Sequence, residues 1–498
     1  METQGKKQEK IIFEYGRKVD ASNDEGYDLH RFPEGIGNTL LPTALTMFGF
    51  CCTLATISGG AVLGMGLYAN QVVIALLIGC FLLSCFSVLN CFMGFRVRLP
   101  IAMITRFAYG HVGSYFPTAA TTVTTWVWLA LSNWMHASAW AMLFAVGIMG
   151  VFPQAPGFKA LFNWGFIGGL VIIAVTMSMA VVKMHGFRLI NQVGKWLFIP
   201  LAVLLVIVYS IVLRYLGGWG ALAQMPPPLV VKGLPPYTLI QGIGIAASIW
   251  VVGSIFFSDF VRFGKDWKVP MFSVPIGMML GGTLSIGIPA LTMIGLYKIL
   301  GDNAFNPLFV ATVIGRTMVI FTCLLVIFAS WSTDSIALYQ LGLNVGNLTL
   351  KRVRTSALPL IISSCILASI VHFFLGILPT VVFMITVLAA ILMSGFGVVL
   401  ADYYVINRMK YPVTVEAVHE MPWKKIWNPI GFGCWLVGFV LGFIAYKFNW
   451  PIPPMIALLS SGVLYIIVCL PLGERIRFSS RLLSPDYKFV SKSSKGIT

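Results

Sequence analysis

Long apolar runs alternate with short polar segments along most of the chain. A helix that crosses a bilayer needs about 20 predominantly apolar residues. The pattern predicts 12 spans, at residues 41–67, 70–94, 115–150, 162–183, 187–213, 238–260, 270–299, 317–345, 355–376, 379–406, 428–448 and 451–473. Because backbone groups in lipid must be hydrogen-bonded within their own segment, we expect every run to be a helix. The sequence therefore predicts an all-α polytopic membrane protein with twelve transmembrane helices.

Polar segments flank this apolar region. Residues 1–34 are polar and charged and lack the apolar core of a cleavable signal peptide. We interpret residues 35–475 as one continuous membrane domain and residues 476–498 as a short basic tail. The longest connection on the outer side, roughly 214–237, contains three consecutive prolines. An ordered cover or a linker is expected there.

The formal charge of +17 suggests a nucleic-acid partner at first, but the distribution of the charge argues against one. Of 34 lysines and arginines, 27 fall in the N-terminal tail, the even-numbered loops and the C-terminal tail. This is the positive-inside pattern, and it predicts a cell-membrane protein with both termini in the cytoplasm. Favourable contacts with anionic lipid follow from the same charges. The basic residues on the opposite side are Lys159, Arg214, Lys232, Lys298 and Lys447.

The 9 cysteines all lie in apolar segments and form no CxxC pair. We interpret them as small buried hydrophobic residues, without a disulfide or metal framework. The chain also contains no HExxH or GxSxG motif and no pair of carboxylates inside the predicted spans. A membrane-embedded enzyme is therefore the disfavoured alternative, and no cofactor is expected. A channel usually shows repeated filter elements, which are not visible here.

Asp334 is the one acidic residue in the interior of a predicted span. It ends the run Ala329-Ser330-Trp331-Ser332-Thr333-Asp334. A carboxylate at the centre of a bilayer costs roughly 2.5–3.5 kcal/mol on insertion scales. We therefore expect Asp334 to act on a polar solute or on an ion.

Two spans contain clusters of glycine, which interrupts a helix easily because it lacks a Cβ. If spans 1–5 and 6–10 are two repeats, the clusters occupy matching positions, where transporters place the binding site. Small-residue contacts between membrane helices are the alternative explanation. The clusters are Ser58-Gly59-Gly60, Gly64 and Gly66 in the first span, and Gly242, Gly244 and Gly253-Ser254 in the sixth.

Candidate solute contacts lie in the third and sixth spans. Thr125, Trp128 and Ser132 have the spacing i, i+3, i+7, which places them on one helical face. Ser248, Ile249, Trp250 and Gly253 surround the predicted break of the sixth span. Two indoles with a few polar groups suit a flat heteroaromatic ring, although tryptophans also serve in packing and at the lipid interface. His136 is expected to be a packing histidine.

Ser332 and Thr333 are candidate cation ligands. Adjacent hydroxyls beside a helix break suit Na⁺, because hard cations take oxygen ligands and unwound carbonyls supply the remainder. The partners would come from the first span, around Gly49, Cys52 and Thr53. Alternatively, each hydroxyl donates to the i−4 carbonyl of its own helix.

Four segments carry a resemblance to a known family. They are residues 258–265 (SDFVRFGK), residues 331–339 (WSTDSIALY), Ala401-Asp402-Tyr403-Tyr404 with Asn407-Arg408, and residues 106–110 (RFAYG) with Gly113-Ser114. Together they cover spans 1–10 in the right order, and the chain resembles the nucleobase–cation symporter-1 family, closest to its cytosine-permease branch.

The resemblance implies a leucine-transporter-type fold, with two inverted five-helix repeats and two additional C-terminal helices. It implies uptake of a nucleobase or a related heterocycle by alternating access, coupled to Na⁺ or H⁺, by a monomer in the bilayer. Trp128 and Trp250 fall on the positions that sandwich the ring, next to Ile249 and Gly253. The span-8 half of the Na⁺ site falls on the Ala329 carbonyl, Ser332 and Thr333, and the span-1 half on Gly49 with Thr53 or Cys52.

Two positions depart from the cytosine permeases. Thr125 stands where they have Gln, and Asp334 stands where they have Asn. An amide donates and accepts hydrogen bonds, whereas an ionised carboxylate only accepts. Another solute of the family is therefore the alternative: a vitamin-precursor pyrimidine such as hydroxymethylpyrimidine, a hydantoin or allantoin.

Overall fold

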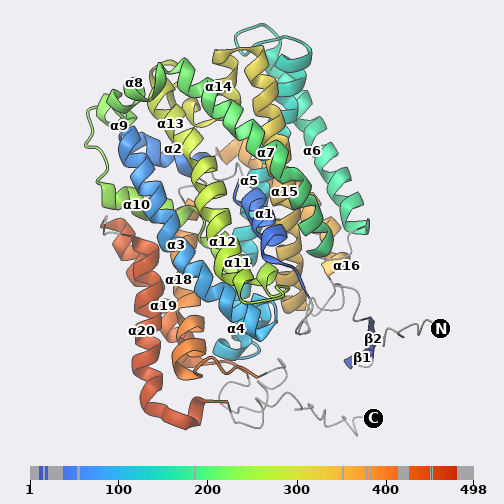
Figure 1. The fold of residues 1–498 in the computed structure, drawn as a ribbon, viewed down its shortest axis with the longest axis vertical. Helices are drawn as coiled ribbons and strands as arrows, with labels where there is room; N and C mark the ends of the chain where they lie inside the picture. Colours follow the sequence, from blue (N-terminus) through green and yellow to red (C-terminus); the bar gives the residue numbers. More distant parts are fainter. Residues whose placement is uncertain are drawn as a thin grey trace, which may run out of the picture.

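The structure of the protein is a computed structural model. It describes residues 11–14, 17–20, 37–52, 57–183, 187–349, 353–375, 380, 383–412, 426–448, 450 and 452–478. Almost all of these residues are helical and pack into one elongated bundle (Figure 1). The exception to the all-α prediction is a two-stranded antiparallel sheet of β1 (Ile11–Glu14) and β2 (Arg17–Asp20), within the predicted N-terminal tail.

The first half of the bundle contains α1 (Leu40–Cys51), α2 (Ile57–Gly66), α3 (Ala69–Val97), α4 (Ile101–Tyr109), α5 (Tyr115–Met142) with η3 (Leu143–Ile148), α6 (Phe158–Lys183), α7 (Phe187–Tyr215), α8 (Gly218–Gln224), α9 (Pro228–Val231), α10 (Leu239–Ile249) and α11 (Val251–Val261). The second half contains α12 (Lys268–Ile276), η4 (Gly277–Gly282), α13 (Thr283–Leu300), η5 (Gly301–Phe305), α14 (Pro307–Ile314), α15 (Arg316–Thr349), α16 (Val353–Ile370), η6 (Val371–Leu375), η7 (Met384–Leu388), α18 (Ala389–Leu400), η8 (Ala401–Ile406), α19 (Pro429–Lys447), α20 (Pro453–Cys469) and η10 (Leu470–Ile476).

Many of these helices are membrane spans by their length and composition. Within the described residues, 9 helices are long and apolar enough to cross a bilayer, and the bent pair α10–α11 makes 10. The remaining two predicted spans correspond to α1 with α2, which are short, and to α5, which is long but rich in Thr, Trp and Ser. The protein is a multi-pass membrane protein, and the total of twelve spans stays a prediction.

The breaks in the first and sixth spans do not lie at the glycines. Helix α1 ends at Cys51, and α2 begins at Ile57, before the first glycine cluster. In the sixth span the helix breaks at Trp250, which has φ −105° and ψ 14°, and the two halves are bent by 43°. The prediction of matching broken spans therefore agrees with the structure, but the prediction that glycines interrupt the helices is wrong.

The glycines instead allow close contacts between helices. A Cβ on Gly60 would lie 2.2 Å from the Ile286 carbonyl oxygen of α13, and one on Gly64 would lie 2.2 Å from that of Ala290. A Cβ on Gly242 would lie 2.4 Å from the Leu67 side chain. Small-residue packing, the alternative explanation, accounts for these positions.

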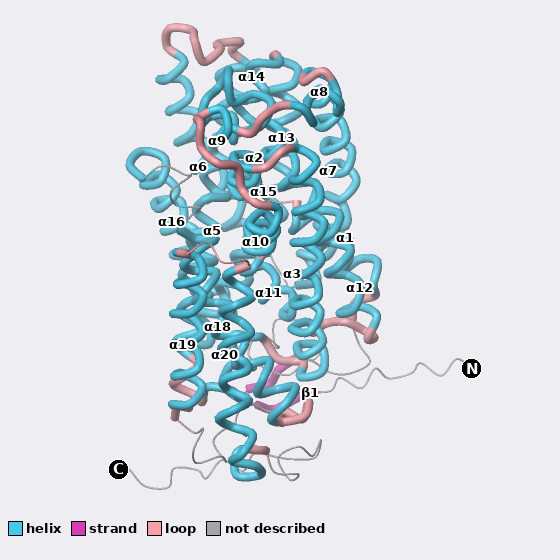
Figure 2. Tube along the Cα trace, turned by 90° about the vertical axis from the view of Figure 1, so that its left-hand side faces the viewer, coloured by secondary structure: helices cyan, strands magenta, loops and turns pink. Residues whose placement is uncertain are grey.

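Helices α5 and α15 run antiparallel at the centre of the bundle. Thr118 near the start of α5 contacts Asn347 near the end of α15, and His136 near the end of α5 contacts Asp334 in α15. Helix α1 packs against α7, α12 and α15, which brings its C-terminal end to the middle of α15. Helices α18, α19 and α20 form a group along one side of the bundle (Figure 2).

The connection between α7 and α10 is ordered, in agreement with the prediction of a cover. It contains α8 and α9, and α9 packs on α2. Lys232, directly after α9, lies 3.7 Å from Asp302 and over the ring of Tyr297, which ties this connection to α13 and η5.

Two further acids are buried in the bundle. Asp259 and Asp402 each have 0% of their surface exposed. The Asp259 carboxylate accepts a hydrogen bond from the Ile101 amide at the start of α4, at 2.6 Å. The Asp402 carboxylate accepts from Tyr411 at 2.7 Å and from Tyr465 at 2.8 Å. Asp334 is therefore distinguished by its position in the middle of a helix.

The 9 cysteines are all free, as predicted. Cys85 is exposed and Cys365 is intermediate, so the prediction that every cysteine is buried is wrong for these two. Both lie in apolar helices of a membrane protein, where the lipid-facing surface is as apolar as the interior. Within the described residues, no group of three or more His, Cys, Asp or Glu side chains could hold a metal ion.

Candidate functional site

A buried pair of side chains joins α5 to α15. His136 Nδ1 lies 3.3 Å from Asp334 Oδ2, and the Asp334 side chain is 1% exposed. The other carboxylate oxygen, Oδ1, is buried and has no hydrogen-bond partner among the described residues. A buried acceptor without a partner is unfavourable, so Oδ1 is the atom of this pair that remains available to a ligand.

Ser132 adds a second open polar atom. It lies one turn before His136 on the same face of α5 and next to Asp334. Its hydroxyl is buried, and the Asp334 carboxylate is the one group among the described residues with which it interacts. A hydroxyl donates and accepts, whereas an ionised carboxylate only accepts. Ser132 and Asp334 can therefore bind neighbouring polar groups of one small molecule.

Thr125 lies closer to the start of α5 than Ser132 does. The Thr125 hydroxyl donates to the Thr121 carbonyl at 2.7 Å. Thr125 precedes His136 by eleven residues, which corresponds to about 16 Å along a helix. Trp128 is half-buried and lies about 12 Å from His136 by the same measure. The structure thus brings Ser132 and His136 to the level of Asp334, and it places Thr125 and Trp128 closer to the start of α5.

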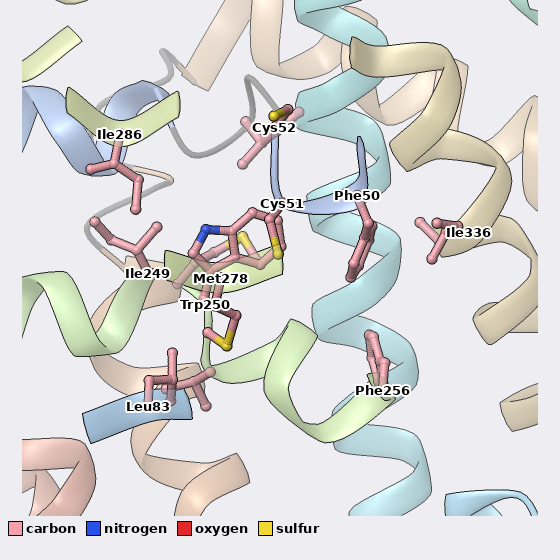
Figure 3. Packing of buried hydrophobic residues seen from close by; sticks show 14 of the residues in the cluster. Phe50, Cys51, Cys52, Leu83, Ile249, Trp250, Phe256, Met278, Ile286 and Ile336 are labelled. Atoms are coloured by element: carbon pink, nitrogen blue, oxygen red, sulfur yellow. The ribbon is translucent and has the colours of Figure 1, made fainter. Parts of the chain in front are cut away.

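Trp250 occupies the break between α10 and α11. Its ring is 4% exposed and packs edge-to-face on Phe50 of α1, with ring centroids 5.4 Å apart. Figure 3 shows the indole next to Cys51 and Met278. The indole N–H finds no acceptor within the described part of the chain. The Trp250 side chain therefore links both broken spans and retains a free donor.

The two residues flanking Trp250 are packing contacts in this conformation. A Cβ on Gly253 would lie 2.6 Å from the Trp250 ring, so the ring needs glycine at this position. Ile249 is 2% exposed and packs on Gly59 of α2, where a Cβ would lie 2.7 Å from its side chain. Both residues hold the indole in place.

The predicted cation ligands of α15 lie against the end of α1. The Thr333 hydroxyl donates to the Ala329 carbonyl at 3.0 Å, so the alternative of an i−4 hydrogen bond within the helix holds for Thr333 in this conformation. The same hydroxyl lies 3.4 Å from the Phe50 carbonyl of α1. The Ser332 hydroxyl oxygen lies 3.0 Å from the position of a Cβ on Gly49. Hydroxyl and carbonyl oxygens from α1 and α15 therefore converge, which is the donor set that suits Na⁺.

The other predicted ligands of α1 are placed differently. The Cys52 thiol lies 4.0 Å from the Gly281 carbonyl of η4, so it is directed away from α15. Thr53 lies outside the described residues. The carbonyl of α1 that contacts Thr333 belongs to Phe50, which the sequence did not single out because a backbone carbonyl leaves no signal in the residue type.

A cavity lies beside α10. It has a volume of about 200 Å³ and is lined by the aromatic residues Tyr237, Tyr446 and Trp450. Its lining also includes Ser248, two residues before Trp250. Neither Trp250 nor Asp334 lines this cavity.

His136 is the site residue that sequence reasoning missed. A single histidine on an apolar helix is ordinarily a packing residue, and no residue type near it in the sequence indicated a charged partner. The available signal was its spacing of four from Ser132, which continues the polar face of Thr125, Trp128 and Ser132.

A bundle of apolar helices with two broken spans, and with polar groups gathered where those breaks meet α5 and α15, defines a membrane transporter. Known proteins agree. The family described as permeases for cytosine/purines, uracil, thiamine and allantoin matches residues 38–467, and the chain belongs to this family. Its relatives are permeases and not enzymes.

Among curated proteins, the cytosine permease of Escherichia coli K12 is 23% identical over 430 residues, which cover 84% of this chain and 91% of that protein. Among solved structures, Mhp1, a nucleobase-cation-symport-1 family transporter in a closed conformation with bromovinylhydantoin bound, superposes with a TM-score of 0.71. It is 16% identical, and the match covers 91% of this chain and 96% of Mhp1.

A Na⁺-coupled sialic acid symporter in a substrate-bound outward-open state has a TM-score of 0.55 at 12% identity, with 91% of this chain and 93% of the symporter covered. These structures establish the fold, which confirms the predicted leucine-transporter-type architecture.

Proposed function

We propose that the protein is a secondary symporter that imports a nucleobase-like heteroaromatic compound by alternating access. Its family and the cytosine permease relatives support this class of solute. The observation that carries the proposal is the open Asp334 Oδ1 atom, buried at the centre of the bundle beside Ser132 and His136. In this proposal residues 1–34 and 476–498 are cytoplasmic tails, and the functional unit is a monomer in the cell membrane.

The solute would present an N–H or amino group to Asp334. His136 holds Oδ2, so Oδ1 accepts from the ring while Ser132 meets a neighbouring polar atom. A site with an open acceptor selects rings that carry a matching donor, because a ring without one leaves the buried oxygen unpaired. Cytosine meets this requirement through its amino group. A hydroxymethylpyrimidine, a hydantoin and allantoin also carry such donors and are the alternative solutes.

Trp250 and Trp128 would hold the faces of the ring, with Trp250 as the main contact. Trp250 lies at the break of the sixth span and contacts Phe50 from the first. Trp128 is half-buried on the face of α5 that continues to Ser132. Thr125, on the same face, would contact the solute on the side of Trp128 that is closer to the start of α5.

The coupling ion would be Na⁺, held where α1 meets α15. The oxygens available are the carbonyls of Phe50 and Ala329 with the hydroxyls of Ser332 and Thr333. Gly49 supports this arrangement because a side chain there would crowd Ser332. Coupling to H⁺ is the alternative, and it requires no oxygen cluster of this kind.

A transport screen in proteoliposomes tests the proposal. Purified protein is supplied with labelled cytosine, uracil, hypoxanthine, guanine, hydroxymethylpyrimidine and allantoin, under an inward Na⁺ gradient or under a pH gradient in Na⁺-free medium. We expect saturable accumulation of at least one ring under the Na⁺ gradient. Accumulation that needs only the pH gradient contradicts the choice of ion, and the absence of uptake of every ring contradicts the proposed function.

A further inference from the structure

One face of α15 carries a row of polar residues beyond the cation ligands. Thr333, Ala337, Gln340, Asn344 and Asn347 follow one another at intervals of four or three residues, which places them on one side of the helix. All but Ala337 are polar, and the three amides are each 0% exposed. The row therefore extends from the cation ligands toward the end of α15.

The last amide of the row is fully bonded. The Asn347 side-chain oxygen accepts from Arg106 Nε of α4 at 2.9 Å. Its amide nitrogen donates to the Thr118 hydroxyl of α5, also at 2.9 Å. Asn347 therefore closes this end of the α5–α15 interface and is a structural residue in this conformation.

The two amides before it are not bonded. The side-chain nitrogen and oxygen of both Gln340 and Asn344 are buried, and none of the four atoms has a hydrogen-bond partner within the described residues. Gln340 lies beside Asp259 of α11, in a geometry that makes no hydrogen bond, and Asp259 Oδ2 is unpaired as well. Buried side-chain amides in folded proteins are nearly always paired. The Gln340 nitrogen can donate to the neighbouring Asp259 carboxylate after a small shift, whereas Asn344 and the Gln340 oxygen are open to a partner outside the protein chain.

Their location is defined by the contacts on either side. Gln340 and Asn344 follow Asp334 by six and ten residues, or about 9 and 15 Å along a helix. Along α15 both amides therefore lie between the level of Asp334, which contacts His136, and that of Asn347, which contacts Thr118.

We propose that Gln340 and Asn344 form an inner station that binds the hydrogen-bonding edge of the solute after it leaves Asp334. A carboxamide offers one acceptor and two donor hydrogens, so it matches a ring edge on which a donor stands next to an acceptor. Asp259 Oδ2 provides a further acceptor for an amino group. This inference rests on the proposed function and extends it, because it selects oxo- and amino-substituted heterocycles over purely apolar rings.

Leucine substitution separates this role from a structural one. Replacing an unpaired buried amide by an apolar group of similar size removes an unfavourable desolvation and leaves nothing unpaired. We therefore expect Gln340→Leu, Asn344→Leu and the double variant to raise the Tm of the purified protein. The turnover of solute uptake in proteoliposomes should fall about fivefold or more, with the Kd of the solute changed by less than about twofold, as when an interaction outside the first binding site is lost.

The matched control is Asn347→Leu on the same face of the same helix. This change removes the hydrogen bonds that the Asn347 side chain makes with Arg106 Nε and with the Thr118 hydroxyl, so the Tm should fall. A Tm that falls for Gln340→Leu and Asn344→Leu as it does for the control overturns the inference, because the amides would then be partnered in the folded state. A raised Tm with unchanged turnover overturns it as well, because the amides would have no part in transport.

A second pair of variants keeps the test decisive if the leucine variants do not fold. Gln340→Glu and Asn344→Asp preserve the shape of the side chain but remove its N–H donors when the acid is ionised. Reduced turnover with unchanged Kd supports the station, and unchanged turnover overturns it. If the wild-type protein transports no heterocycle, the proposed function fails. If the wild type transports one and every variant equals it, only the inner station fails.

Discussion

His136 Nδ1 lies 3.3 Å from Asp334 Oδ2, and this contact joins α5 to α15 in the middle of the bundle. The His136 imidazole holds one oxygen of a buried carboxylate and leaves the other oxygen open. Removal of one partner from a buried hydrogen-bonded pair destabilises a protein by about 1–3 kcal/mol, and by more for a charged group, because the remaining group is left buried without a partner.

We therefore expect His136→Leu to lower the thermal stability of the purified protein strongly. The control is the double variant His136→Leu/Asp334→Leu, which buries no charge and should recover most of the loss. Thermal unfolding of both variants and of Asp334→Leu gives the coupling between the two residues. Additive changes would show that the pair contributes no interaction energy.

Asp334→Asn should change which ring the protein prefers. The substitution keeps the size of the side chain and replaces an acceptor by a group that also donates, as in the cytosine permeases that the sequence resembles. Competition of unlabelled heterocycles against the preferred solute measures the effect. We expect the order of preference to shift by about tenfold for at least one ring, which corresponds to 1.4 kcal/mol. An unchanged order of preference would show that Asp334 does not discriminate between the rings.

Thr333→Ala should weaken the dependence of uptake on Na⁺. The Thr333 hydroxyl lies at the junction with the Phe50 carbonyl of α1, and alanine removes that oxygen. We expect the Na⁺ concentration for half-maximal uptake to rise about tenfold, whereas Thr333→Ser, which retains the hydroxyl, should stay close to the wild type. Equal Na⁺ curves for the alanine variant and the wild type would place the ion elsewhere.

Gly49→Ala tests the same junction from α1. The added Cβ would stand 3.0 Å from the Ser332 hydroxyl oxygen and force it to shift. The Na⁺ dependence should weaken while solute binding at saturating Na⁺ is retained. Gly168→Ala is a suitable control, because a Cβ there has nothing within 4 Å.

Trp250→Ala should weaken binding of the ring more than Trp128→Ala does. Stacked aromatic rings gain about 0.5–1.5 kcal/mol beyond the area that they bury, which corresponds to about 2- to 12-fold in Kd. Trp250 is fixed at the break by Phe50 and Gly253, whereas Trp128 is half-buried at a different level. Equilibrium binding to Trp250→Phe serves as the control, since phenylalanine retains a ring. Normal affinity in Trp250→Ala would remove the indole from the site.

Most of the membrane-spanning segments could be predicted from the sequence because the length of an apolar run indicates them. The junction of α1 with α15 was also predictable in part, because Ser332 and Thr333 are adjacent hydroxyls in an apolar helix. The positions of the helix breaks could not be predicted. The sixth span breaks at Trp250, whose φ and ψ angles are ordinary for a helix end. Such a break needs no glycine or proline at that residue, so the residue type does not indicate it.

The register between α5 and α15 along their axes was the second feature that the sequence could not predict. The spacing of Thr125, Trp128 and Ser132 defines a face of α5, but it does not say which of them lies opposite Asp334. That level is set by packing along the whole α5–α15 interface, where Thr118 meets Asn347 and His136 meets Asp334. His136 could be identified as a site residue only when that register was known.

Steady-state accumulation in proteoliposomes tests the central claim most directly. Wild-type protein and Asp334→Ala are compared with the solute that the transport screen identifies, under an inward Na⁺ gradient, and the ratio of internal to external solute is measured. We predict a ratio well above one for the wild type, collapse of the ratio when the Na⁺ gradient is dissipated, and a ratio near one for Asp334→Ala. Equal accumulation by the two proteins would contradict a transport site built around Asp334.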